Sequence, residues 1–170
     1  MKSTDVLEIV ALLERNGIPV WVDGGWGVDA LLGKQTRPHG DLDIAVQHKD
    51  VPRLRSLLEA RGYRDVPRPD TKDWNFVLGD DQRHQVDVHS YTFDAAGKHV
   101  YGTQYPADAL TGTGSIDGRA VQCISAERMV QFRTGYALRE VDIQDVEALH
   151  RKFGIPIPEE HRSWRKTHPQ

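Results

Sequence analysis

The chain has 170 residues, 38% of them hydrophobic, which is enough for one compact domain with a sizeable core and too little for two full domains. Its formal net charge of -3 argues against a broad nucleic-acid-binding surface, because such surfaces carry an excess of basic residues. The single cysteine, Cys123, excludes an intrachain disulfide, and no apolar run approaches the length of a membrane span. The sequence also shows no signal peptide, so we expect a cytoplasmic protein without a membrane partner.

The first predicted elements are a scaffold helix and a strand. Apolar residues recur at helical spacing over residues 5–16, with Asp5 and Glu8 placed like a capping box and Gly17 as the stop. A short apolar strand is predicted over residues 19–23. This strand leads directly into the stretch around which the rest of the chain is organised.

Gly24 and Gly25 separate this strand from an apolar segment, residues 26–32, which predicts a short helix that ends at Gly33. Glycine at such a turn lets another group approach the backbone. The unpaired N–H groups at the start of the helix favour an anion such as phosphate. Gly24 and Gly25 are therefore candidates for nucleotide binding.

The polar loop over residues 34–40 supplies two further candidates for phosphate binding. Arg37 offers a guanidinium fork that matches phosphate oxygens bidentately, although a solvated loop charge is the alternative interpretation. His39 is a candidate as well, but it can instead orient the loop by hydrogen bonding. The residues alone leave both alternatives open.

Alternating apolar residues over 41–46 predict a half-buried strand with Asp41 and Asp43 on one face. At a rise of about 3.3 Å per residue, the two carboxylates lie roughly 6 to 7 Å apart and can share one or two hard cations, for which Mg2+ is the natural choice. Asp87, in the alternating run 85–89, is the candidate third carboxylate that two-metal phosphoryl transfer needs near the attacking oxygen. For any one of these residues, a solvent-facing position on a half-exposed strand is the alternative.

The middle of the chain predicts a helix over residues 50–62 and a short strand over residues 63–66. The helix carries apolar residues on one side only, as expected of an element that packs on a sheet. Strands over residues 74–78 and 85–89 then flank a polar turn, so that Asp87 stands on a hairpin.

Residues 91–114 lose regular periodicity. Their interleaved aromatic side chains predict a loop that lines the pocket for the acceptor, the molecule that would receive the transferred group. Tyr91 is the candidate in this segment for contact with an acceptor. His89 is a second candidate because it lies on the same strand face as Asp87, with a hydrogen-bonded structural histidine as the alternative.

The C-terminal part predicts a hairpin over residues 115–124, which turns at an Asp-Gly pair, and helices over residues 126–138 and 141–153. The two helices are expected to close over the sheet. Tyr136, in the first of them, can face the pocket, with core packing as the alternative. Prolines in residues 156–170 predict an extended or packed tail.

The glycine pair and the carboxylate pair belong to a longer pattern. Its members, in order, are Gly24-Gly25-Trp26, Asp29, Gly33, Arg37, His39 and Asp41-x-Asp43. This pattern resembles the DNA polymerase β-like nucleotidyltransferase superfamily, and within it the lincosamide nucleotidyltransferases and the aminoglycoside 2''-nucleotidyltransferases. The similarity covers most of residues 1–153.

The resemblance implies a mixed α/β (α+β) fold, in which the mixed sheet of the polymerase β-like arrangement is flanked by helices and followed by a C-terminal helical pair. We expect a nucleotidyltransferase domain over residues 1–155, with its core in residues 18–125 and the helical pair in residues 126–153. Residues 156–170 would form a tail. Pairing of small subunits is known in the resembled group, so a homodimer is an expected assembly.

The resemblance also implies a Mg2+-dependent adenylyltransferase, which transfers AMP from ATP or another nucleoside triphosphate to a hydroxyl of a small-molecule antibiotic. The acceptor would be a lincosamide or an aminoglycoside, as in an antibiotic resistance enzyme. The residues expected to hold two Mg2+ ions and to act in catalysis are Asp41, Asp43 and Asp87. The nucleotide-binding residues would be Gly24, Gly25, Arg37 and His39, and the acceptor-binding residues would be His89, Tyr91 and Tyr136.

Three other functions stay open at this point. The first is an adenylyltransferase of the same fold that modifies a protein or RNA partner, as an antitoxin-type enzyme does. The second is a nucleotide-binding module without catalysis, which the presence of all three aspartates disfavours. The third is a metal hydrolase built from His84, Asp87 and His89, which would bind zinc or another transition metal.

Overall fold

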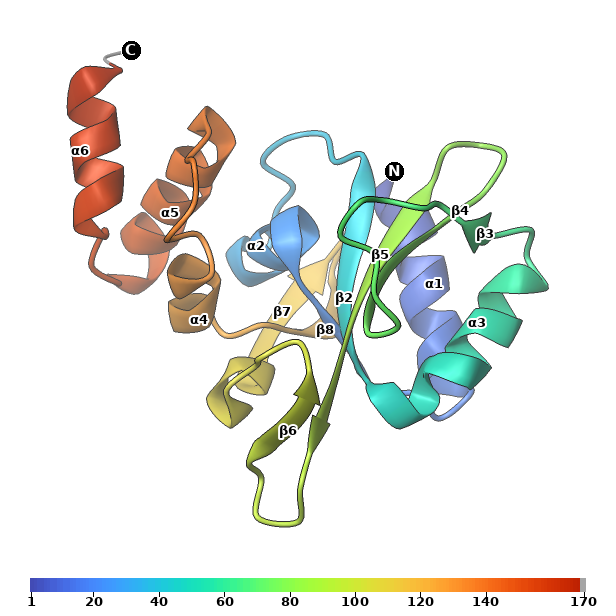
Figure 1. Ribbon diagram of the computed structural model, residues 1–170. Coiled ribbons are helices and arrows are strands. Elements are labelled where there is room, and N and C mark those ends of the chain that lie inside the picture. The colour runs from blue at the N-terminus through green and yellow to red at the C-terminus, as the bar shows by residue number, and fades with distance from the viewer. Residues whose placement is uncertain (169–170) are drawn as a thin grey trace.

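The computed structural model describes residues 1–168, which form a mixed sheet with helices on both of its faces (Figure 1). The strands are β1 (Val20–Val22), β2 (Asp41–Gln47), β3 (Arg64–Asp65), β4 (Asn75–Gly79), β5 (Gln85–Phe93), β6 (His99–Gly102), β7 (Gly112–Ile116) and β8 (Arg119–Cys123). The helices are α1 (Ser3–Arg15), α2 (Gly24–Leu32), α3 (Val51–Glu59), α4 (Ala126–Gln131), α5 (Glu140–Phe153) and α6 (Glu159–Thr167), with 3-10 helices η1 (His48–Asp50) and η2 (Ala107–Thr111).

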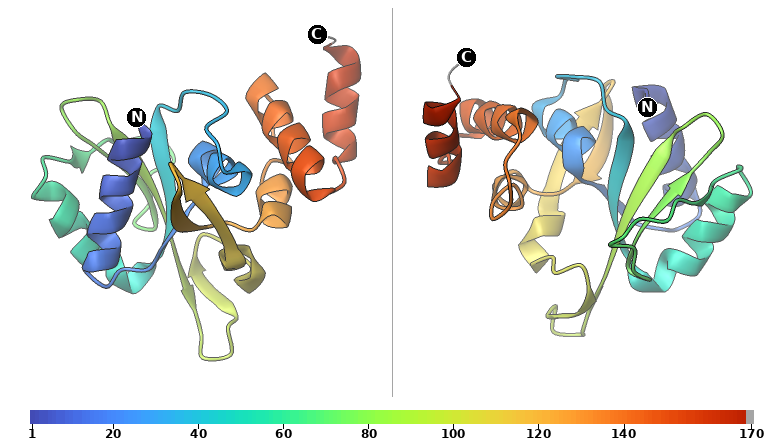
Figure 2. Two further views of the ribbon diagram at one scale, coloured as in Figure 1. Left: turned by 180° about the vertical axis from the view of Figure 1, so that it is seen from behind. Right: turned by 45° about the horizontal axis from the view of Figure 1, so that its top comes forward.

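The described strands follow the order β3-β4-β5-β2-β1-β8-β7, and β6 pairs with β5 beside this path. The β2–β5 and β1–β8 pairs are parallel and the other pairs are antiparallel, so the predicted mixed sheet is confirmed. Figure 2 shows α1 and α3 on one face of the sheet and α2, α4 and α5 on the other, with α6 outermost beside α5. No helix within residues 1–168 is long and apolar enough to cross a membrane.

Alternation along β2 and β5 separates the core from the site. Leu42 and Ile44 on β2 and Val86 and Val88 on β5 are fully buried, and the residues between them face the other way. The two strands pair in parallel with Asp43 opposite Asp87. The parallel register therefore brings carboxylates from two distant parts of the sequence side by side.

The strand, helix and stop predicted around the glycine pair are confirmed. Asp23 is the N-cap of α2 and accepts the N–H of Gly24 at 2.7 Å, a contact that holds the turn. Gly33 ends the helix in the left-handed region, with φ of 73°. The helix begins at Gly24 itself, so the glycines form its first turn and do not precede it.

The predicted cap of the first helix is displaced. Helix α1 begins at Ser3, and its capping box joins Lys2 to Asp5, whose Oδ2 accepts the Lys2 N–H at 2.8 Å. Glu8 takes no part in this cap and forms an ion pair with Arg61 at 2.7 Å. The helix therefore starts earlier than its apolar periodicity indicated, because its first turn is held by a polar contact.

Residues 91–114 are more regular than predicted. Strand β5 continues to Phe93, and β6, η2 and the start of β7 all lie within this segment. The pairing of β6 with β5 crosses a register shift between Thr92 and Phe93. Glycines at the turns and this irregular pairing hide the strand from any search for simple alternation.

Two predictions for the C-terminal part also need correction. Helix α4 ends at Gln131, not near Leu138, and Gly135 follows in the left-handed region with φ of 82°. The tail, predicted to be extended or packed, contains a helix that was not predicted, α6, which begins directly after Pro158, a position that a helix start tolerates. The tail is packed, because His161 is buried and Arg165 forms ion pairs with α5; residues 169–170 lie outside the described residues.

Candidate active site

The start of α2 is shaped so that other side chains can lie against it. A Cβ atom at Gly24 would collide with the carboxylate of Asp43, and a Cβ atom at Gly25 would collide with the ring of His39. Gly24 also has φ of 57°, which side-chain-bearing residues rarely adopt. The glycine pair therefore brings an aspartate and a histidine into contact with the first turn of a helix.

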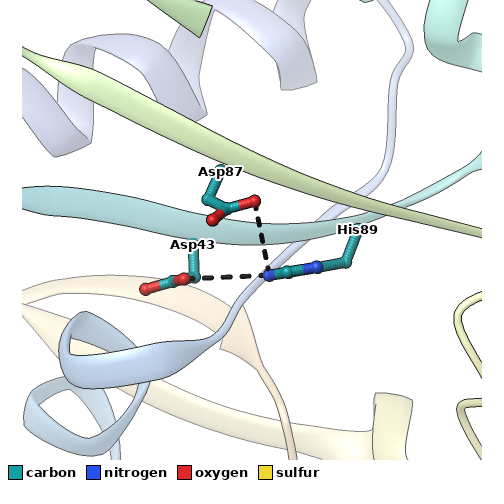
Figure 3. A group of neighbouring side chains, drawn as sticks. All are labelled: Asp43, Asp87 and His89. Atoms are coloured by element: carbon teal, nitrogen blue, oxygen red, sulfur yellow. Dashed lines mark ion pairs between the residues drawn. The ribbon is translucent and has the colours of Figure 1, made fainter. Parts of the chain in front are cut away.

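Asp43, Asp87 and His89 form a tight group at the centre of the sheet (Figure 3). Nε2 of His89 lies 3.7 Å from Oδ1 of Asp43 and 3.7 Å from Oδ1 of Asp87. One ligand atom of each residue lies within 4.8 Å of the others. Asp41 is not part of this group, although it stands on the same face of β2 two residues away. The three predicted carboxylates are thus neighbours, and Asp43 and Asp87 are the pair placed to share an ion.

The electrostatics of this group reflect crowded acids. Burial raises the pKa of Asp41, and the charge of Asp43 adds to the effect. Burial also raises the pKa of Asp87, against the opposing charge of His89. Burial lowers the pKa of His89, but the hydrogen bond with Asp43 and the charges of Asp23 and Asp87 outweigh it and raise the pKa to about 9. The group therefore stabilises a positive charge between its carboxylates.

The residues present fit a divalent cation. Oδ1 of Asp87 is buried and has no hydrogen-bond partner among the described residues. This oxygen points toward Asp43 and His89. Within the group of three side chains, only the imidazole of His89 can carry a positive charge beside it. Carboxylate oxygens are the ligands that Mg2+ prefers, and a bound cation would relieve the mutual repulsion of the acids.

A cavity of about 670 Å³ opens beside this group. Its wall combines the start of α2, the loop before β2, the segment 103–105 and the C-terminal segment 132–145. The predicted site residues in this wall are Gly24, Gly25, Arg37, His39, Asp41, Asp43, His89 and Tyr136. Asp87 adjoins the wall through Asp43 and His89.

Arg37 and His39 form a chain of hydrogen bonds beside the glycines. Nη1 of Arg37 donates to Nδ1 of His39 at 2.8 Å, and Nε2 of His39 lies 2.5 Å from Oδ2 of Asp29. Because a guanidinium only donates, Nδ1 of His39 must accept, and the ring proton lies on Nε2 toward Asp29. His39 is buried and fixed, as its alternative interpretation held, while the Arg37 side chain remains 28% exposed.

A second network, from α5 and the segment directly after α4, reaches the same helix start. The buried Arg133 donates to the carbonyl of Gly24 at 3.0 Å and to Oδ2 of Asp145 at 3.0 Å. Asp145 also accepts from Arg37 at 3.3 Å. The helices predicted over residues 126–138 and 141–153 include Arg133 and Asp145, but helical periodicity does not reveal which polar side chains are buried.

Tyr136 and Tyr105 face the cavity from different segments. Tyr136 is 45% exposed, and burial of its hydroxyl together with the charge of Asp142 raises its pKa to about 12. Tyr105 is buried, and its hydroxyl donates to Oδ2 of Asp23 at 2.7 Å. Sequence reasoning did not single out Tyr105, because its place depends on the irregular segment before β7.

Tyr91, the other predicted acceptor contact, does not lie at the cavity. Its side chain is 1% exposed, and its ring packs against Trp21, Phe93 and Tyr105. Strand β5 extends past His89 to Phe93, so Tyr91 lies within the strand, and these aromatic rings cover its side chain. We therefore withdraw Tyr91 as an acceptor-binding residue.

The residues of the alternative zinc hydrolase do not come together. His84 lies in the turn before β5, where Nδ1 is 2.9 Å from Asp80 and Nε2 is 3.4 Å from Asp5. It ties this turn to α1 and is absent from the group of Asp87 and His89. The hydrolase interpretation is wrong for this reason.

Comparison with known protein families matches residues 5–149 to the family described as aminoglycoside-2''-adenylyltransferase. The chain belongs to this family. The match spans the glycine pair, the three carboxylates and the Arg133–Asp145 network. The family resemblance predicted from the Gly-Gly and Asp-x-Asp pattern is thereby confirmed, and the enzyme class is nucleotidyltransferase.

Two curated relatives of this adenylyltransferase come from bacteria. It is 30% identical over 161 residues to a lincosamide resistance protein of Staphylococcus haemolyticus, and this similarity covers 88% of the chain and 98% of the relative. It is 26% identical over 129 residues to a 2''-aminoglycoside nucleotidyltransferase of Escherichia coli, covering 75% of the chain and 70% of that relative. The relatives thus include a protein named for lincosamide resistance and a nucleotidyltransferase named for aminoglycosides.

Solved structures give the same assignment of fold. The lincosamide antibiotic adenylyltransferase LnuA, crystallised with lincomycin, has a TM-score of 0.75 and 27% identity to this adenylyltransferase, over 88% of the chain and 96% of LnuA. ANT(2'')-Ia in complex with adenylyl-2''-tobramycin has a TM-score of 0.75 and 21% identity, over 97% of the chain and 95% of that protein. The second likeness shows the fold alone. The predicted polymerase β-like fold class is confirmed.

Proposed function

We propose that this adenylyltransferase transfers AMP from ATP to a hydroxyl group of a lincosamide antibiotic in a Mg2+-dependent reaction. The observation that carries the proposal is the placement of Asp43 and Asp87 in register on parallel strands, directly against a glycine helix start. The lincosamide resistance protein, matched over 98% of its length, supports a lincosamide before an aminoglycoside as the acceptor. An aminoglycoside is the second candidate because of the family match.

The chain's own groups can bind and orient a nucleoside triphosphate. Because Asp23 takes the N–H of Gly24, the N–H of Gly25 is the one left at the glycine pair for a phosphate oxygen. Arg37 faces the same cavity with a partly exposed guanidinium, which matches a phosphate bidentately. His39 acts on Arg37 through the hydrogen bond between them and has no free ring nitrogen for the nucleotide.

Three carboxylates would hold the divalent ions, which neutralise charge on the triphosphate when bound. Asp43 and Asp87 fit a shared ion, and Asp41 lies in the same wall outside their tight group, which supports a second position beside Asp43. Asp87 accepts the proton of the acceptor hydroxyl. The acceptor oxygen then attacks the α-phosphorus in line, and the bond from that phosphorus to the leaving pyrophosphate breaks.

The acceptor has room in the rest of the cavity. His89 and Tyr136 remain the proposed acceptor contacts from the sequence, and Tyr105, which lines the cavity, replaces Tyr91 among them. Three further points rest on the family likeness: ATP in preference to other triphosphates, two ions in preference to one, and a homodimer. ATP is a cytoplasmic metabolite, which agrees with the expected cytoplasmic location.

The test is pyrophosphate release from ATP and Mg2+ across a panel of lincosamides and aminoglycosides, with mass spectrometry of the acceptor. We expect release with lincosamides and a product heavier by one AMP. Asp87→Asn should lower kcat by roughly 10²- to 10⁴-fold, as loss of a proton acceptor does. Asp81→Asn, an exposed aspartate in the preceding turn, is the control and should retain full activity. The proposal would be contradicted if the protein binds ATP but releases pyrophosphate with none of the acceptors in the panel.

A further inference from the structure

Arg68 contacts Asp87 from the loop between β3 and β4. Its Nη1 lies 3.3 Å from Oδ2 of Asp87, and its Nη2 donates to Oε1 of Gln85 at 2.9 Å. Gln85 and Asp87 are two residues apart on β5 and therefore share one face of the strand. The planar guanidinium thus spans two neighbouring side chains on the strand that carries the proposed proton acceptor.

The loop around Arg68 is closed upon itself. The N–H of Arg68 donates to Oγ1 of Thr71 at 2.9 Å, and the N–H of Thr71 donates back to the carbonyl of Arg68 at 3.1 Å. Pro67 and Pro69 flank the arginine, so that φ is restricted on both sides and Arg68 itself is kept out of the helical region. The side chain starts from a fixed turn, although it is 36% exposed.

This contact gives the two oxygens of Asp87 different surroundings. Oδ2 is taken by Arg68, whereas Oδ1 is buried without a hydrogen-bond partner among the described residues. Oδ1 also lies on the side of His89, whose Nε2 is 3.7 Å away. A carboxylate held at one oxygen cannot rotate freely, so its other oxygen keeps its direction.

We propose that Arg68 is a positioning residue, which holds the carboxylate of Asp87 so that Oδ1 faces the ion shared with Asp43 and the acceptor hydroxyl. The proposal rests on the proposed function. A guanidinium suits the task because its second donor group is anchored on Gln85, which fixes the plane of the first. Lysine at this position would keep the charge and lose the second contact.

The test measures metal binding separately from turnover. Mn2+ serves as a paramagnetic probe for the Mg2+ site and is titrated without nucleotide, with free Mn2+ read by electron paramagnetic resonance. Arg68→Met keeps an unbranched apolar stem and removes the charge and donors of the guanidinium. We expect the dissociation constant for Mn2+ to rise roughly tenfold or more, and kcat to fall more than the KM for ATP rises. Arg68→Lys should give values between those of Arg68→Met and the unchanged protein.

The matched control is Arg61→Met. Arg61 is similarly exposed, at 38%, and also forms an ion pair with a single carboxylate, that of Glu8, but on the α1 side of the molecule. Its loss should leave Mn2+ binding and kcat unchanged. Arg68→Ala supplies a further readout, because guanidinium ion added to the solution can enter the vacated place and should restore part of the activity.

The outcomes separate the two proposals. If the unchanged protein transfers AMP and binds Mn2+, but Arg68→Met binds Mn2+ equally well, the role of Arg68 is refuted and the proposed function stands. Tighter Mn2+ binding by Arg68→Met would also refute it, because Arg68 would then compete with the metal for Asp87. If the unchanged protein neither binds Mn2+ nor releases pyrophosphate, both proposals fail together.

Discussion

Two regions of the molecule build the same cavity by different means. On β2 and β5, backbone register alone sets Asp43 opposite Asp87, and the hydrophobic side chains between them fix that register from the other face. In the C-terminal part, Arg133 follows α4, forms a buried ion pair with Asp145 on α5, and donates to the carbonyl of Gly24 at the start of α2. Where strand register positions the site, removal of one side chain should leave the fold stable. Where a buried ion pair positions it, removal of one partner leaves an unpaired buried charge and lowers stability.

Apart from Asp87→Asn, which removes the proton acceptor, the largest loss of activity should follow from disturbing the contact between Gly24 on α2 and Asp43 on β2. Gly24→Ala forces the carboxylate of Asp43 away from the helix start, because its Cβ would occupy the same space. We expect kcat to fall on the order of 10²-fold, as small misplacements of reacting groups do. Steady-state kinetics at saturating ATP measures this change.

The control for that prediction separates backbone strain from the clash. Gly17 has φ of 72° and open space where a Cβ would lie, so Gly17→Ala carries the strain alone. Both variants should lose about 1 to 2 kcal/mol of unfolding free energy in urea. If Gly17→Ala lowers kcat as much as Gly24→Ala, the contact with Asp43 is not the cause.

Disruption of the buried network should lower the stability of the protein. Asp145→Ala leaves the Arg133 guanidinium, which is 9% exposed, without its carboxylate. We expect a loss of about 3 kcal/mol in the free energy of unfolding, measured by urea denaturation. Glu147→Ala, on the same helix with a more exposed ion pair to Arg165, should change stability by less than about 1 kcal/mol. Equal losses in the two variants would remove the distinction between the regions.

On the carboxylate strands, replacement of Asp41 should have the smallest effect, and it should raise stability where the other variants lower it. Burial raises the pKa of Asp41, so the folded state binds this proton more tightly than the unfolded state. Stability is therefore lost as pH rises from the ordinary aspartate pKa through the raised one, and Asp41→Asn avoids that loss. We expect Asp41→Asn to have a higher melting temperature than the unchanged protein at neutral pH, and the gain to vanish in acid. An Asp41→Asn variant that melts lower at neutral pH would contradict this reasoning.

The sequence predicted those parts of the site that local patterns encode. Alternation in residues 41–46 and 85–89 predicted both strands, and the same-face rule predicted that Asp87 and His89 would point together. Gly24 and Gly25 predicted the strand, turn and helix. These inferences succeeded because each depends on residues close together in the chain.

The parts that sequence reasoning missed depend on contacts between distant segments. Tyr91 and Tyr105 belong to one aromatic cluster, and contacts between distant segments place Tyr105 but not Tyr91 in the cavity wall. Arg68 sits between two prolines in a loop whose direction no periodicity reveals. Helix α6 was missed because Pro156 and Pro158, which suggest an irregular chain, lie directly before its first residue. The helix is also supported by ion pairs with α5, which the local sequence does not reveal.

The position of β1 between β2 and β8 sets the order in which the molecule can be completed during synthesis. Val22 pairs with Cys123, so one edge of β1 stays open until most of the chain has left the ribosome. An open edge is a template for pairing with another chain, and such long-range pairing forms slowly. Arg133 reaches the carbonyl of Gly24 from still further along the sequence. The start of α2 is therefore among the last parts of the enzyme to acquire its final shape.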